Sequence, residues 1–430
     1  MSNLIYKYDT PHYANIFKNI GIIFLLYFFI FQPPLFSSLS FSRAVYLTIE
    51  IIVFMAVYIH NPGYTKNFIK QFKVEIRFLV VICAYSVLRD LVSMELVYAD
   101  RFLTFSFQAF FFSYLIIFLF HKNEVKNKGT KENKNIFNII YWTCLLAAIF
   151  STLLLLIPSF DSFYESISYD SYYETYAGFE QRYRAYGISE NLSFTYAYIM
   201  GLFCGYSLLL LRKNVFFIIP LILFLLGVVY NARIGFVAVL LFILYFLFIR
   251  LNFKALLQTI TIGFLSYLSI IVFFPKLMET LTGNFNWVLS GFYEVSDFVF
   301  GTKYQERNTL ETLTSDFIIF PDSLGEWIVG RGISLFTEKG MNSDVGYILQ
   351  LNYGGIVLLL LILSFMIYMC WRFYHYFGLK HWYTMFFMFS LLILNFKGFI
   401  YASTPGGRLL FFLYIYFLYK RFNNTAQYKN

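Results

Sequence analysis

Arg233 stands in a short polar gap, Asn231-Ala232-Arg233-Ile234-Gly235, between the apolar runs Val215–Tyr230 and Ile234–Ile249. Each run approaches the roughly 20 residues with which a helix crosses a bilayer core. The distribution of the other charges, given below, puts this gap on the outer side of a membrane, where Lys and Arg are sparse. A cation held at that depth, with no loop to carry it into water, is a candidate functional residue.

More basic residues fall on the same expected face. A guanidinium binds phosphate oxygens with two parallel hydrogen bonds and stays charged at any pH. Together with Arg233, these residues predict a site for a lipid-linked pyrophosphate at the boundary between lipid and water. They are Arg182 and Arg184 before the sixth apolar run, Arg331 in Gly330-Arg331-Gly332, Lys397 toward the outer end of the eleventh run, and Arg408 at the start of the twelfth.

Other roles stay open for three of these residues. Arg182 and Arg184 have Glu180 and Glu190 nearby as ion-pair partners. Arg408 opens a helix, so its long side chain could simply reach toward water.

Acidic residues also occur inside the apolar runs. Glu50 stands in the middle of one run, where it marks either a proton or ion path or a hydrogen-bonded structural glutamate. Arg89 and Asp90 lie side by side near the outer end of the third run, and we expect them to form an ion pair.

The positions of the histidines exclude several classes of chemistry. All five map to the inner side: His12, His60, His121, His375 and His381. This placement excludes a histidine base, a Ser-His-Asp triad or a histidine zinc site on the outer face. No Asp-x-Asp sequence occurs, and the first outer loop, Phe31–Arg43, has no acidic residue, which disfavours a metal-dependent glycosyltransferase. We therefore predict no metal and no other cofactor.

The composition is that of a membrane protein. The chain has 430 residues, of which 59% are hydrophobic and 13% are charged, whereas a soluble domain carries about 25% charged residues. Twelve apolar runs predict an all-α, polytopic integral membrane protein with about 12 transmembrane helices in a single domain, 1–430. The runs are roughly 19–36, 42–59, 78–94, 102–120, 136–158, 193–211, 215–231, 234–250, 256–275, 345–371, 382–399 and 408–420.

The charges also predict the orientation. With both termini in the cytoplasm, twenty of the 33 basic residues fall in inner segments, and most acidic residues fall outside. The formal charge of +9 therefore does not indicate nucleic-acid binding.

Two outer loops are long, at about 159–192 and, between helices 9 and 10, at about 276–344. The second contains Trp287 and Trp327 and amphipathic stretches, so we expect surface helices there, and chemistry in these loops.

Three short motifs carry a resemblance to a known family. They are Gly330-Arg331-Gly332-Ile333, then Asn342-Ser343-Asp344-Val345-Gly346-Tyr347, then Gly354-Gly355-Ile356. A Gly-rich end of the large outer loop, a polar cluster before a helix and a Gly-Gly step one turn on resemble the Wzy-type O-antigen polymerases, which share a superfamily with the O-antigen ligases. The gap around Arg233 is similar to the family's Ser-Arg-Thr-Gly turn, with Ala and Ile replacing Ser and Thr.

The resemblance implies a glycosyl transfer at the periplasmic face of the bacterial inner membrane. A growing glycan leaves undecaprenyl pyrophosphate and joins an incoming lipid-linked repeat unit. Arg233 and Arg331, with Arg184, are expected to neutralise the leaving pyrophosphate without a metal. Asp344 is expected to be the general base, with Glu190 and Asp316 as alternatives.

The same resemblance implies the partners. They are undecaprenyl-pyrophosphate-linked oligosaccharides and membrane lipid, with a chain-length regulator and a flippase as further candidates. Two other functions stay open. A lipid-linked oligosaccharide flippase or transporter would not need a 69-residue outer loop at 276–344. An O-antigen ligase would place a histidine in the polar cluster where this chain has Asn342-Ser343-Asp344.

Overall fold

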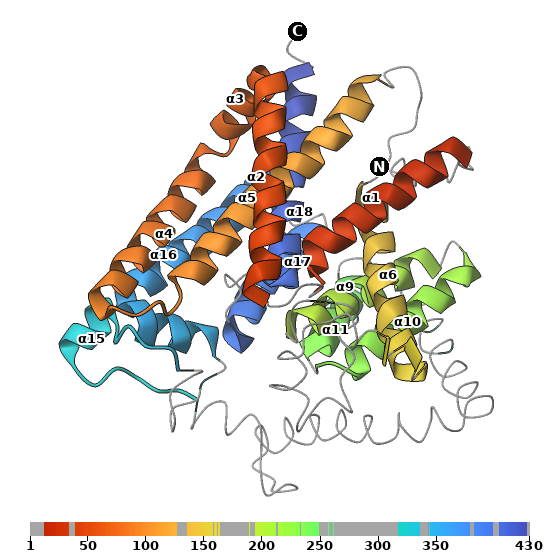
Figure 1. Cartoon of the computed structure of the whole chain (residues 1–430). Helices are drawn as coiled ribbons and strands as arrows, with labels where there is room; N and C mark the ends of the chain where they lie inside the picture. The colour runs from red at the N-terminus through yellow and green to blue at the C-terminus, as the bar shows by residue number, and fades with distance from the viewer. Residues whose placement is uncertain are drawn as a thin grey trace, which may run out of the picture.

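The computed structural model describes residues 13–33, 39–126, 136–157, 159–160, 162–163, 189, 194–211, 214–232, 234–248, 257, 261, 317–335, 343, 345–378, 382–398 and 404–427. Every regular element in this part of the chain is a helix, so the predicted all-α class is confirmed (Figure 1). Three described helices are long and apolar enough to cross a membrane, or four spans if the bent pair Ala44–His60 and Pro62–Gln71 is counted as one. The number of about twelve spans stays a prediction.

The described helices follow the apolar runs. A helix covers most of each predicted run except 256–275, of which only residues 257 and 261 are described. The helices are α1 (Tyr13–Phe31), α2 (Leu39–His60), α3 (Pro62–Gln71), α4 (Lys73–Ser93), α5 (Ala99–Lys126), α6 (Ile136–Leu156), α9 (Phe194–Leu211), α10 (Ile218–Val229) after a short 3-10 turn η2 (Val215–Phe217), α11 (Ile234–Phe248), α15 (Leu324–Val329), α16 (Gly346–Phe377), α17 (Trp382–Lys397) and α18 (Pro405–Gln427).

The helices form a bundle whose two ends differ. In Figure 1, α3 and the C-terminal ends of α5 and α18 lie at one end, and α15 lies at the other. The charge distribution predicts that the first three of these segments lie on the inner side of a membrane and that α15 lies on the outer side. Most of the two long outer loops lies outside the described residues, including Trp287. Within the second loop, α15 is a short helix whose first turn is capped by the Ser323 side chain.

Helix α16 is interrupted at Gly355, whose backbone angles, φ 66° and ψ −169°, are not helical. Glycine adopts positive φ without the clash that a Cβ would cause. A break of this kind leaves main-chain carbonyls without helical partners, and lipid offers no water to satisfy them. Other parts of the protein therefore have to cover the break.

The end of the second outer loop covers one side of the break. The backbone N–H of Arg331 donates to the Asn352 carbonyl at an N···O distance of 2.6 Å, and the Gly332 N–H donates to the same carbonyl at 3.3 Å. These bonds fasten the loop to α16 just before Gly355.

Helix α4 covers the other side. The Tyr85 hydroxyl donates to the Gly354 carbonyl at 2.7 Å. Arg89 donates through Nε to the Tyr353 carbonyl at 3.3 Å and through Nη2 to the Gly330 carbonyl at 2.8 Å. Arg89 thus joins the loop, α16 and α4 at one point.

Alanine in place of Gly355 is expected to loosen this junction. A Cβ at Gly355 would lie 2.6 Å from the Gly330 nitrogen and would collide with the Ile328 carbonyl. Its backbone conformation is one that only glycine adopts readily, so the strain costs about 1–3 kcal/mol. We expect a lower unfolding temperature and faster hydrogen exchange at the Arg331 amide. Gly325→Ala is the matched control, because a Cβ there meets nothing within 4 Å; equal effects of both substitutions would contradict the expectation.

Candidate functional site

Glycines let the ends of several helices approach closely, as small residues do where helices pack in membranes. A Cβ at Gly235, in the first turn of α11, would lie 2.6 Å from the Ala197 carbonyl of α9. A Cβ at Gly346, the first residue of α16, would collide with the Asn395 carbonyl near the end of α17. These contacts join α11 to α9 and α16 to α17.

Two further glycines complete the junction. A Cβ at Gly398, directly after α17, would collide with the Phe194 ring at the start of α9. One at Gly406, near the start of α18, would lie 2.7 Å from Thr195 Cβ, also in α9. The starts of α9, α11, α16 and α18 and the end of α17 therefore meet at one end of the bundle. We call this meeting point the helix-end junction.

Two of the predicted site residues directly adjoin the helix-end junction in the sequence, since Arg233 immediately precedes α11 and Asp344 lies two residues before α16. Two others, Arg182 and Arg184, lie farther upstream, on the segment that leads to α9. All four lie outside the described residues. The structure therefore brings together the helix ends next to Arg233 and Asp344, and the contacts of all four residues stay a prediction.

Arg408, in the first turn of α18, is fully buried. Its guanidinium donates twice to the Ile30 carbonyl, from Nε at 3.0 Å and from Nη2 at 2.7 Å. Nη1 donates to Gln32 Oε1 at 3.0 Å and to Gln108 Oε1 at 3.5 Å. The alternative in which Arg408 reaches toward water is therefore wrong. Its side chain instead ties α18 to the end of α1 and to α5.

Glu50 of α2 is buried within electrostatic reach of Arg408 but forms no ion pair with it, and we call Gln32, Glu50, Gln108 and Arg408 the Arg408 cluster. The Glu50 side chain is 1% exposed, and the charge of Arg408 acts on its carboxylate. Neither Glu50 oxygen has a hydrogen-bond donor among the described residues, and neither does the side-chain nitrogen of Gln32 have an acceptor among them. Buried polar groups are almost always hydrogen-bonded. Two such groups without partners near a buried cation therefore make the Arg408 cluster a candidate functional site.

The backbone at Gln32 supports this interpretation. Its φ of 45° is uncommon for a residue other than glycine. Strained conformations persist only where surrounding contacts hold them, and they concentrate at functional sites. Here Arg408 and Gln108 both bind the Gln32 side chain, the latter from Nε2 at 3.3 Å.

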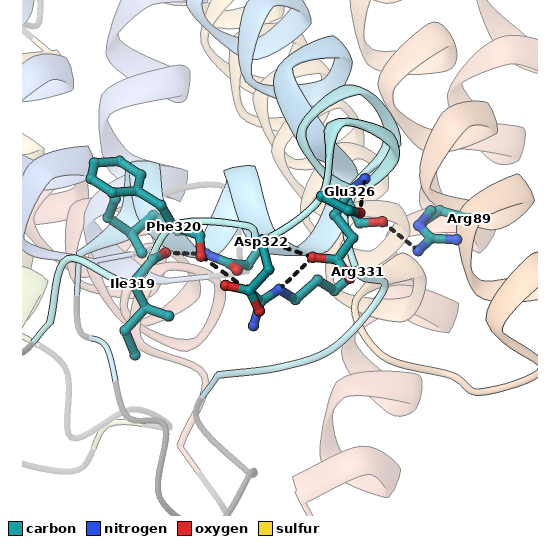
Figure 2. A network of polar contacts seen from close by, with 10 residues as sticks. Arg89, Ile319, Phe320, Asp322, Glu326 and Arg331 are labelled. Carbon is teal, nitrogen blue, oxygen red and sulfur yellow. Dashed lines mark hydrogen bonds and ion pairs between the residues drawn. The ribbon is translucent and has the colours of Figure 1, made fainter.

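Arg331 is held within its own loop (Figure 2). Its Nη2 lies 2.8 Å from Asp322 Oδ2, its Nε lies 3.1 Å from Glu326 Oε2, and it donates to the Phe320 carbonyl at 3.0 Å. The pKa of Glu326 is held below its ordinary value, mainly because its carboxylate accepts the backbone N–H of Asp322 and further because of Arg331. In this arrangement Arg331 stabilises the loop over the α16 break. Binding a phosphate would require it to leave these partners.

Lys397, the last residue of α17, is partly exposed at the helix-end junction. Two residues before it, the buried Asn395 exchanges hydrogen bonds with Gln350 of α16. Gln350 Nε2 donates to Asn395 Oδ1 at 2.7 Å, and Asn395 Nδ2 donates to Gln350 Oε1 at 3.3 Å. This amide pair fixes α16 against α17 beneath Lys397.

Arg89 and Asp90 do not form the predicted ion pair. Arg89 donates to main-chain carbonyls across the α16 break, as described above. Asp90 Oδ2 accepts the backbone N–H groups of Val97, Tyr98 and Ala99 at 2.9–3.3 Å, which satisfies free donors before the first turn of α5. Neighbours in sequence on a helix point to different faces, and here each residue binds a different element.

The described part of the fold and its site define a class: an all-helical, membrane-associated protein with a buried arginine–glutamate cluster beside a junction of helix ends. Comparisons with protein-family models, with curated proteins and with solved structures find no match. Among the described residues, no group of three or more His, Cys, Asp or Glu side chains is placed to hold a metal ion.

Proposed function

We propose that this protein is a polysaccharide polymerase, a metal-independent membrane glycosyltransferase of the bacterial inner membrane. It transfers a growing glycan from undecaprenyl pyrophosphate to an incoming lipid-linked repeat unit at the periplasmic face. The observation that supports this most directly is the helix-end junction. Its helices lead in the sequence to Arg184, Arg233 and Asp344, and it lies next to Lys397 and the first turn of α18, where Arg408 stands.

The proposed reaction needs one base and several cations. The acceptor hydroxyl oxygen attacks the anomeric carbon of the donor glycan as its proton passes to the Asp344 carboxylate. The bond between that carbon and the pyrophosphate oxygen breaks, and the lipid pyrophosphate leaves with the bonding electrons. Arg233 stabilises the negative charge that develops on it, and Arg182, Arg184 and Lys397 bind the remaining phosphate and glycan.

Arg408 and Arg331 act differently in this proposal. Arg408 is buried, so it sets the electrostatic potential below the site and keeps α1, α5 and α18 in register. Arg331 holds the outer loop in its closed position through Asp322 and Glu326. Opening of this loop frees the Arg331 guanidinium for the leaving pyrophosphate.

A transporter of lipid-linked oligosaccharides is the second candidate, and one observation favours it. The Arg408 cluster draws its members from α1, α2, α5 and α18, so a buried cation and a buried carboxylate lie inside the bundle. A transporter is expected to place its charged residues on several spans in this way.

Deletion of the gene in its own host separates the two functions. Loss of a polymerase is expected to leave single repeat units at the cell surface, because export continues without elongation. Loss of a transporter is expected to remove every repeat unit from the surface. Electrophoresis of the extracted polysaccharide shows which occurs.

With purified protein and lipid-linked repeat units, polymerisation is expected to continue in EDTA. Loss of activity that added metal restores would contradict the metal-independent mechanism.

A further inference from the structure

The corner between α3 and α4 carries an uncompensated positive charge. Its four basic residues are exposed: Lys66, Lys70, Lys73 and Arg77. None of them makes an ion pair with any residue that the structure describes. Lys66 and Lys70 lie one helical turn apart on α3, and Lys73 and Arg77 repeat that spacing on α4.

The single acidic residue of this corner is committed to the interior. Glu75 is 1% exposed and forms an ion pair with Arg372 of α16. Its carboxylate also accepts the Tyr414 hydroxyl of α18 at 2.6 Å. Arg372 donates in addition to the Gln71 carbonyl at 2.8 Å. These contacts hold the corner against α16 and α18, so the backbone that carries the four cations is fixed in position.

The opposite face of α3 is packed into the bundle. Thr65 Oγ1 lies 2.5 Å from the Tyr114 hydroxyl, and Phe68 packs against the rings of Tyr114 and Tyr419. Between the cations, Ile69 and Val74 are 40% and 38% exposed. Basic residues interleaved with exposed apolar ones are typical of a helix that lies at a membrane interface.

The direction of α3 fits this position. Pro62 starts the helix, and α3 turns by 114° from α2. If α2 crosses the membrane, α3 runs closer to the membrane plane than to its normal. The corner lies at the end of the bundle opposite α15 (Figure 1), far from the proposed reaction.

We propose that the α3–α4 corner binds the headgroups of anionic phospholipids of the surrounding bilayer. Lys66, Lys70, Lys73 and Arg77 bind the headgroup phosphates, and Ile69 and Val74 contact the upper acyl chains. The occupant is a lipid and not a soluble phosphate, because the cations alternate with exposed apolar side chains on a surface next to apolar spans. Each basic residue near an anionic surface strengthens binding by about fivefold.

The test uses the full-length protein, purified in a neutral detergent, and its unfolding temperature as phosphatidylglycerol or phosphatidylcholine is added. We expect phosphatidylglycerol to raise the unfolding temperature more than phosphatidylcholine, and added salt to weaken the effect. The triple substitution Lys66→Gln, Lys70→Gln, Lys73→Gln is expected to weaken phosphatidylglycerol binding on the order of 100-fold. The corresponding Lys→Arg triple is expected to keep it.

The control removes the same charge from another expected inner segment, with Lys128→Gln, Lys131→Gln and Lys134→Gln, which lie outside the described residues. This variant is expected to bind phosphatidylglycerol as the wild type does. Equal losses in the two Gln triples would overturn the proposal, as would no loss in the first. Glycerol phosphate should leave the unfolding temperature unchanged; an effect equal to that of phosphatidylglycerol would make the corner a site for soluble phosphate and would also overturn it.

Discussion

Arg408→Ala is expected to abolish long-chain polysaccharide and to lower the stability of the folded protein, since each buried acceptor left without a donor costs about 1–3 kcal/mol. The substitution takes the donors away from the Ile30 carbonyl and from Gln32 Oε1. Thermal unfolding in detergent measures the first effect, and electrophoresis of the polysaccharide measures the second.

A double substitution separates structure from function at this cluster. Arg408→Gln combined with Glu50→Gln removes both ionisable groups and leaves polar groups of similar size, so much of the lost stability should return. Long-chain polysaccharide should still be absent, because the cation is gone. If the double variant makes chains of normal length, the charge of Arg408 has only a structural role.

The Arg372–Glu75 pair provides a matched control. It is a buried arginine–glutamate ion pair that lies at the other end of the bundle. Arg372→Ala is expected to lower the unfolding temperature to a similar degree. The companion double variant, Arg372→Gln with Glu75→Gln, is expected to keep chain length normal. A shortened polysaccharide in this control would show that chain length responds to lost stability alone.

Arg233→Ala is expected to abolish long-chain polysaccharide while the protein still inserts into the membrane at its normal level. Removal of a single group that stabilises developing negative charge costs about 100- to 1,000-fold in turnover. Arg233→Lys keeps the charge but cannot bind a phosphate with two parallel hydrogen bonds, so this variant should make only short chains. Electrophoresis of the polysaccharide and immunoblotting of the membrane fraction provide the measurements.

Arg101 is a suitable control for Arg233, because it is an arginine in the first turn of α5, on the same expected side of the membrane. Its guanidinium lies over the Tyr98 ring at 5.1 Å from the ring centre, and the proposed mechanism gives it no role. Arg101→Ala should leave chain length unchanged. Normal chains in the Arg233→Ala strain would remove the central cation from the proposed mechanism.

Helix positions follow from composition because each long apolar run has to satisfy its backbone internally, and a helix is the simplest way to do so. The runs at 102–120, 136–158 and 345–371 accordingly coincide with helices that could cross a membrane. Helix α3 was missed, since its ten residues carry too few apolar side chains to stand out from an inner loop. The buried face of α3 is defined by its contacts with Tyr114 and Tyr419, which only the folded structure shows.

The interruption of α16 could be suspected but not located in the sequence. Gly354-Gly355 is compatible with a continuous helix, a kink or a break, because glycine permits all three. The break forms here because the loop around Arg331 and the side chains of Tyr85 and Arg89 satisfy the exposed carbonyls. Two of these partners are far from Gly355 in the sequence, so no local pattern contains them.

Residue types alone supplied the prediction about chemistry: arginines beside apolar runs, carboxylates without histidines, and an acid at position 50. The partners of those residues were decided by the tertiary structure. Arg408 was expected to face water or a phosphate, yet it binds Gln32 and Gln108 in the interior. Arg331 was expected in the site, yet it binds Asp322 and Glu326. The reason is physical: a sequence shows which charges exist, but a buried charge is compensated by whatever polar groups packing brings within about 3 Å. Those groups come from helices that only the fold makes neighbours.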